Sequence, residues 1–195
     1  MDESEITPRL VLDTNCLIDL EEGRPDAVHV RVLINAARSK LVQLAVAAIS
    51  ASENQRGGEP IQDYADFEAW LARLDLGDVQ QLLPLATWDV GFWDHMLWNS
   101  EELDAEAEKI RATLFPNDTP APNLQGAEGR KWRNRHCDAM LVWCCIHHGW
   151  RTLITNDRNF HSRQPELERL GLGAVLTPEQ AARQYASISG ALESQ

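Results

Sequence analysis

Short apolar runs of strand length alternate with longer helical patterns along this chain, and this alternation constrains the fold more than any other feature. Strands that are separated by helices pair in parallel, and a parallel sheet needs helices on both faces because both faces are apolar. We therefore expect an α/β protein, a three-layer α/β/α sandwich around a central parallel sheet. The expected strands lie at 9–12, 41–48, 80–86, 151–155 and 173–176.

The helical segments between these runs have recognisable starts and stops. A helix is expected over 25–40, where a proline suits the first turn. A long apolar helix is expected to begin near Asp138 and to stop at Gly149. Residues 177–180, with the sequence Thr-Pro-Glu-Gln, form the capping pattern of a final helix.

Residues 87–130 differ in composition from the rest of the chain. They carry Trp88, Trp93 and Trp98, followed by an acidic helix from about Asn99. The 195 residues fit one domain, so we interpret this region as a Trp-rich helical insertion in a single domain, 1–195. The tryptophans are expected to pack inside the insertion, and stacking on nucleic-acid bases is the alternative.

The charge of the chain is unevenly distributed. The net charge of −12 argues against a nucleic-acid partner, because basic side chains drive phosphate binding. Residues 130–163, however, hold seven basic side chains against two acids, a local balance of +5. This stretch predicts a phosphate-binding surface, with solvated surface ion pairs as the alternative. The cations assigned to substrate binding are Arg130, Lys131, Arg133, Arg135 and Arg158.

The four cysteines do not form a common metal-binding or redox pattern. No Cys-x-x-Cys pair occurs, and Cys144 and Cys145 lie in an apolar run, so buried reduced thiols are expected. The alternative is a zinc site whose spacing matches no common finger. Its ligands would be His136, Cys137, Cys144 and His148.

No apolar run is long enough for a membrane span, and the acidic first ten residues lack the order of a secretory signal. The chain is therefore expected to be cytoplasmic.

Four acids that lie far apart in the sequence are expected to meet at one edge of the sheet. Asp13 and Asp157 follow expected strands, Glu53 follows the second strand after a short turn, and Asp138 stands at the expected helix start. Ligands of open α/β sheets bind beyond the carboxyl ends of the strands. Clustered carboxylates repel one another unless a cation compensates, and hard oxygen ligands suit Mg²⁺ or Mn²⁺. The pattern predicts a divalent-metal site that hydrolyses phosphodiesters, with supporting hydrogen bonds from Thr14, Asn15 and Asn156.

Each acid alone also has an ordinary structural explanation. Asp13 and Asp138 would each cap a helix, and Glu53 would be a first-turn glutamate favoured by the helix dipole. Asp157 would shape a turn. An accidental meeting of four acids at one edge is less probable, so the joint interpretation is preferred.

Three segments resemble the PIN-domain family of metal-dependent nucleases. LVLDTNCLIDL resembles its first-strand motif, with Asp13 at the first acidic position, and Ser52-Glu53 resembles the second. RNRHCDAMLVWCCIHHGWRTLITNDRNF resembles its C-terminal signature, with Asp138 and Asp157 at the third and fourth positions. The resemblance covers 9–57 and 131–176. It implies a parallel α/β/α sandwich and an Mg²⁺- or Mn²⁺-dependent endoribonuclease, often the toxin of a toxin–antitoxin pair.

The resemblance also implies binding partners, and other functions remain as alternatives to it. It implies an RNA substrate, a possible antitoxin protein and a possible homodimer, while the insertion at 87–130 departs from it. One alternative is a PIN-like module that binds RNA or protein without cleaving. An aspartyl-phosphate phosphatase is ranked lower. Such chemistry generally needs a second Asp, two residues after the first, as the acid/base group, and that position is Asn15 here.

Overall fold

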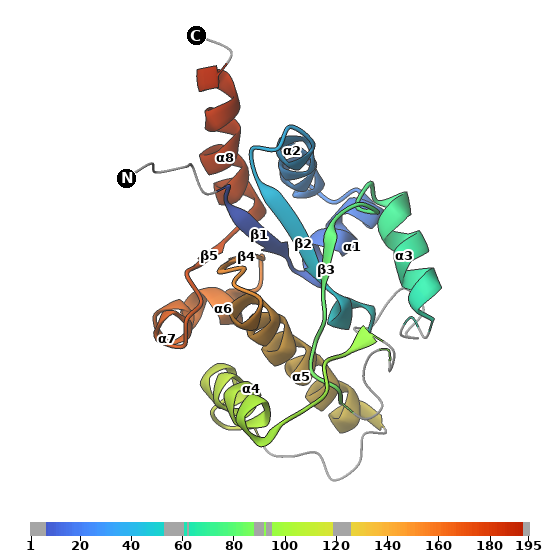
Figure 1. Ribbon diagram of the computed structural model, residues 1–195, viewed down its shortest axis with the longest axis vertical. Coiled ribbons are helices and arrows are strands. Elements are labelled where there is room, and N and C mark those ends of the chain that lie inside the picture. The colour runs from blue at the N-terminus through green and yellow to red at the C-terminus, as the bar shows by residue number, and fades with distance from the viewer. Residues whose placement is uncertain are drawn as a thin grey trace.

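A computed structural model describes residues 7–52, 61, 63–87, 92, 95–118 and 126–192, without the side chains of 52 and 186–192. Its centre is one five-stranded parallel sheet with the order β3-β2-β1-β4-β5 (Figure 1). All five expected strands are present. The first has the expected bounds, and the other four are shorter than their apolar runs. The strands are β1 Arg9–Leu12, β2 Gln43–Ala47, β3 Gln80–Leu82, β4 Thr152–Ile154 and β5 Ala174–Leu176.

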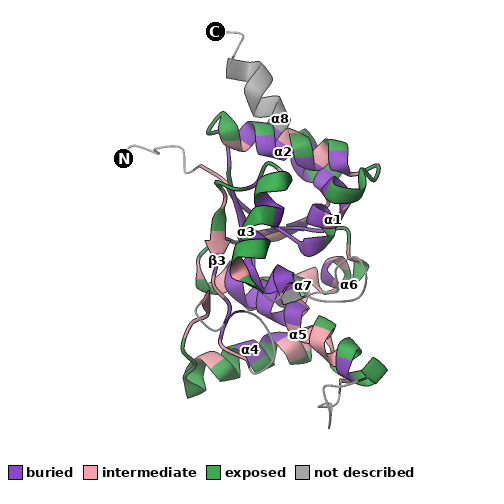
Figure 2. Ribbon diagram, turned by 90° about the vertical axis from the view of Figure 1, so that its right-hand side faces the viewer, coloured by how far each residue is buried: buried purple, intermediate pink, exposed green. Residues whose placement is uncertain are grey.

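Side chains alternate between the two faces of the sheet, and both faces are buried. Leu10 and Leu12 of β1 belong to one apolar cluster, whereas Val11 between them belongs to the other. The first cluster includes apolar side chains from four helices: α1 Thr14–Glu22, α2 Ala27–Arg38, α3 Tyr64–Arg73 and α8 Pro178–Leu192. The second contains α4 Glu101–Leu114, α5 Gly126–His147 and the short helices α6 Arg158–Ser162 and α7 Gln164–Arg169. Helices on both faces are consistent with the expected α/β/α layering (Figure 2).

The described helices confirm several expected starts and stops. Thr177 and Gln180 form the expected reciprocal cap of α8: the Thr177 hydroxyl accepts from the Gln180 amide at 3.1 Å, and the Gln180 side chain accepts from the Thr177 amide at 2.9 Å. Helix α5 ends before Gly149, whose φ of 72° lies in the left-handed region that favours glycine.

The expected start of α5 is wrong. The helix begins at Gly126, twelve residues before Asp138, so Asp138 lies in its interior and cannot cap it. The polar first half is held by packing: Gly129 is buried, and Trp132 packs against the core cluster that includes α4. Helix α4 lies on the side of α5 away from the sheet (Figures 1 and 2).

None of the helices in the described part of the chain combines the length and the apolar character that a membrane crossing requires.

Candidate functional site

The strand order creates a switch point between β1 and β4. From β1 the chain moves outward through β2 to β3, and it then returns to place β4 on the other side of β1. Crossovers that leave in opposite directions open a crevice at the carboxyl ends of the two strands, and ligands of such sheets bind there. Asp13 directly follows β1, and Thr155, Asn156 and Asp157 directly follow β4.

Asp13 is anchored on both sides of this switch point. Its backbone amide donates to the Ile154 carbonyl at 3.0 Å, which ties the end of β1 to the end of β4. Its carboxylate oxygen Oδ2 accepts from the Thr155 hydroxyl at 2.6 Å and from the Asn15 amide at 3.1 Å. Asp13 occupies the position before α1, but its side chain makes no capping hydrogen bond there. The ordinary explanation of Asp13 as a helix cap therefore does not account for this buried carboxylate.

Asp157 is reached from Asp13 through one side chain. Thr155 is fully buried, and its hydroxyl accepts from the Asp157 amide at 2.9 Å while it donates to Asp13. Asp157 Oδ1 also accepts from the Asn159 amide at 2.7 Å and thereby caps α6. The alternative considered for Asp157 was a turn-shaping role; the structure shows a helix cap instead, and the cap does not engage the second carboxylate oxygen of Asp157.

Asp138 reaches the same region from α5. Burial, followed by the negative charges of Asp13 and Asp157, raises the pKa of Asp138 to about 8, and Arg135 one turn earlier only partly offsets this. Burial also raises the pKa of Asp13, against the hydrogen bonds from Thr155 and Asn15, and the charge of Asp157 adds to it. Three carboxyl groups from β1, β4 and α5 therefore share one electrostatic environment with too little positive charge.

The three carboxyl groups are not arranged as a complete set of ligands around one ion. Among the residues that the structure describes, no three acidic, histidine or cysteine side chains lie close enough to hold one ion together. The fourth expected acid, Glu53, lies outside the described residues. The donor chemistry fits a hard divalent cation, because these carboxylate oxygens are its preferred ligands and a cation would relieve their repulsion.

The expected supporting residues have different surroundings. Asn15 contacts Asp13 as expected, and Thr14 is buried beside it. Asn156 instead donates to Asp26 Oδ2 at 2.9 Å. Asn156 and Asp26 line a depression of about 390 Å³ that also reaches Asp157. Thr155, which bridges the two acids, was not predicted from the sequence.

The basic residues assigned to substrate binding fall into two groups. Arg130, Lys131 and Arg158 are exposed. Arg135 pairs with Asp118 and lies 5.3 Å from the centre of the Phe115 ring, so it is engaged inside the protein. Arg133 is half-buried.

The tryptophans of the insertion do not behave uniformly. Trp98 is 89% exposed, so the packing interpretation is wrong for it. Trp88 and Trp93 lie outside the described residues. Trp132, just after the expected insertion, is half-buried and stacks on His136.

All four cysteines are buried and none forms a disulfide, and the histidines of the alternative zinc site have other partners. His136 Nε2 lies 3.0 Å from the Thr87 hydroxyl, and His148 Nε2 lies 3.0 Å from the Leu83 carbonyl.

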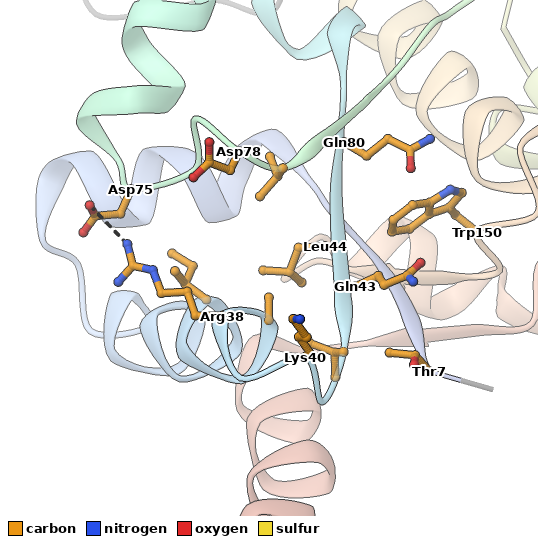
Figure 3. Close-up of a pocket in the computed structure, with 13 residues that line it drawn as sticks. Thr7, Arg38, Lys40, Gln43, Leu44, Asp75, Asp78, Gln80 and Trp150 are labelled. Atoms are coloured by element: carbon orange, nitrogen blue, oxygen red, sulfur yellow. Dashed lines mark ion pairs between the residues drawn. The ribbon is translucent and has the colours of Figure 1, made fainter. Parts of the chain in front are cut away.

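A cavity of about 660 Å³ lies at the opposite, amino-terminal edge of the sheet (Figure 3). Its wall includes Gln43 and Gln80 at the starts of β2 and β3, and Trp150 before β4. An ion pair between Arg38 and Asp75 borders it at 3.3 Å. None of the predicted site residues lines this cavity, so the switch point remains the candidate site.

No protein-family model matches the chain, and neither a curated protein nor a solved structure matches it at a significant level.

Proposed function

We propose that this protein is a metal-dependent endoribonuclease of the PIN-like type, with its active site at the switch point between β1 and β4. The observation that carries the proposal is the hydrogen-bonded link from Asp13 through Thr155 to Asp157 at the ends of β1 and β4, with Asp138 of α5 within the electrostatic influence of both acids. Ligands of α/β sheets bind at such a switch point, and a strongly perturbed carboxyl group there is a functional candidate.

Asp13, Asp138 and Asp157 would hold Mg²⁺ or Mn²⁺, with Glu53 as a fourth ligand. Such an ion supplies Lewis-acid activation of water and neutralises charge on the phosphate. Thr155 and Asn15 orient the Asp13 carboxylate by donating to it, which leaves its other oxygen for the ion. The exposed cations Arg130, Lys131 and Arg158 attract the RNA backbone.

A module that binds RNA or protein without cleaving is the second candidate. It is favoured by one observation: the described acids are not close enough together to hold an ion in their present positions. The phosphatase alternative is weaker, because the Asn15 amide already donates to Asp13 and an amide cannot serve as the acid/base group. The antitoxin and the homodimer follow from the resemblance alone and remain proposals.

Cleavage of end-labelled single-stranded RNA by the purified protein distinguishes the two candidates. We expect cleavage with Mn²⁺ or Mg²⁺, none with EDTA, and a loss of at least about a hundredfold in Asp13→Asn and Asp157→Asn. Asp78→Asn is the matched control, because Asp78 lies at the opposite edge of the sheet. Metal-dependent cleavage that survives Asp13→Asn would refute the site, and binding without cleavage by the wild-type protein would favour the binding module.

A further inference from the structure

A second cavity lies between α4 and α5, within and beside the insertion, and has a volume of about 490 Å³. Its floor is apolar and includes Met140, and a few polar side chains of α4 surround it. This combination of size, apolar floor and few polar groups is typical of sites for small organic groups. The cavity contains none of the acids assigned to the proposed active site.

The lining of the cavity includes a stacked aromatic pair. Trp132 and His136, one turn apart on α5, stack with their ring centres 5.1 Å apart and an interplanar angle of 10°. An aromatic wall suits a planar ring, because every nucleobase has a face that stacks on aromatic side chains.

The polar groups along the cavity favour a base over a phosphate. Asp104 and Asn99 are exposed along it, and the Asn99 amide donates to Asp104 Oδ1 at 2.5 Å. Glu108, also in the lining, is already paired with Arg111 at 2.7 Å. A carboxylate repels phosphate and only accepts hydrogen bonds, so Asp104 selects a group with N–H donors. Cytosine presents an amino group where uracil presents a carbonyl oxygen.

We propose that the cavity between α4 and α5 is a nucleobase site that prefers amino-bearing bases, cytosine among them, over uracil. Its role as a specificity site for the RNA substrate rests on the proposed function. Asp138 lies two residues beyond His136 on α5, so the two side chains leave the helix on nearly opposite sides, and the acids and the cavity lie on different faces of α5. A strand with its phosphate at the acids therefore has to pass around α5 to place a base in the cavity.

Binding of nucleosides tests the site without any need for catalysis. Cytidine and uridine are titrated separately into protein labelled with ¹⁵N in its indole groups, and the Trp132 signal is assigned by its loss in Trp132→Phe. We expect cytidine to shift the Trp132 signal with an affinity at least about fivefold above that of uridine, in line with one good base contact. Asp104→Asn should remove this preference. Glu106→Gln is the matched control, because Glu106 is also exposed on α4 but does not line the cavity.

Equal shifts with both nucleosides, or none with either, overturn the inference. So does a Trp132 shift caused by an arginine-rich peptide and not by nucleosides, since that identifies a basic protein partner.

Cleavage of paired oligonucleotides that differ by a single C or U separates this inference from the proposed function. A wild-type preference for the C-containing strand that Asp104→Asn loses and Glu106→Gln keeps supports both. An unchanged cleavage profile in Asp104→Asn overturns the specificity site and leaves the nuclease intact. Cytidine binding in a protein that cleaves no RNA supports the base site and removes the nuclease.

Discussion

The Thr155 hydroxyl donates to Asp13 Oδ2 at 2.6 Å and accepts from the Asp157 amide at 2.9 Å, so one side chain fixes the ends of two neighbouring strands. Thr155 is fully buried, and the Ile154 carbonyl before it accepts from the Asp13 amide. The two acids are thereby held in register at the switch point, before any ligand is present.

Replacing Thr155 by valine should therefore reduce both stability and activity. Thr155→Val keeps the shape but leaves the buried Asp13 carboxylate without its shortest hydrogen bond, which we expect to lower the free energy of unfolding by about 1–3 kcal/mol. The rate of RNA cleavage should fall by about tenfold or more, because the carboxylate loses its orientation. Thr155→Ser, which retains the hydroxyl, should recover most of both losses. Urea unfolding and cleavage assays measure the two effects, and equal behaviour of the valine and serine variants would contradict this role.

The pKa of Asp138 makes stability fall as pH rises. The pKa of Asp138 in the folded protein is about 8, against 3.8 for an unperturbed aspartate, so the folded protein binds more protons than the unfolded chain between these values. The unfavourable contribution of Asp138 to the free energy of unfolding is absent below about pH 4, grows through neutrality and is complete above about pH 8. Asp138→Asn should thus stabilise the metal-free protein at alkaline pH, by at most about 6 kcal/mol, and change little in acid.

Thermal unfolding across pH, with and without Mn²⁺, checks this expectation. In the wild-type protein, Mn²⁺ should raise the unfolding temperature most at alkaline pH, where Asp138 is ionised, and Asp138→Asn should lose most of that gain. A pH profile that is the same for the two metal-free proteins would show that Asp138 is not the group responsible.

The strands were predictable because their signal is local, whereas α5 was not. Each buried strand is a short apolar run, and both faces of a parallel sheet require such runs. The first half of α5, GAEGRKWRNRH, is polar and contains two glycines, which are poor helix formers, so its sequence gives no apolar period. Tertiary packing of Gly129 and Trp132 overrides that local preference. The helices α6 and α7, of five and six residues, are too short for a periodic pattern.

Part of the site was predictable for the same reason. Asp13 and Asp157 follow strands and could be placed from the sequence alone. Thr155 could not, because a threonine at the end of a strand is common and its double hydrogen bond depends on the pairing of β1 with β4. The hydrogen-bond partner of the Asn156 side chain could not be predicted either, because Asp26 is 130 residues away in the sequence.

Two helix ends provide opposite stability predictions. Lys40 ends α2 in the left-handed conformation, with φ of 60° and hydrogen bonds from its own amide to Ala37 and from the Leu41 amide to Ala36, both 2.9 Å. Lys40→Gly relieves this conformation and should raise the free energy of unfolding by about 0.5–1 kcal/mol. Gly149→Ala has room for its methyl group, because no atom lies within 4 Å. The substitution nevertheless places an alanine at φ 72°, and this strain should lower the free energy of unfolding by about 1 kcal/mol. Urea unfolding measures both, and changes of the same sign would disprove this account.

The exposed cations and the paired Arg135 should differ in what they contribute to RNA binding. Arg158 and Lys131 are exposed, so under the proposed function each would neutralise a phosphate, and alanine at either position should reduce the salt slope of RNA binding by about 0.7. Arg135 is committed to Asp118, which is almost buried and also pairs with Arg111 at 2.9 Å. Arg135→Ala should leave the slope nearly unchanged and instead lower the free energy of unfolding by about 1–3 kcal/mol, because Asp118 loses one of its two partners. Anisotropy of labelled single-stranded RNA with the Asp13→Asn protein, measured over a range of KCl, gives the slopes, and a slope that falls most in Arg135→Ala would show that Arg135 contacts phosphate and would contradict its structural role.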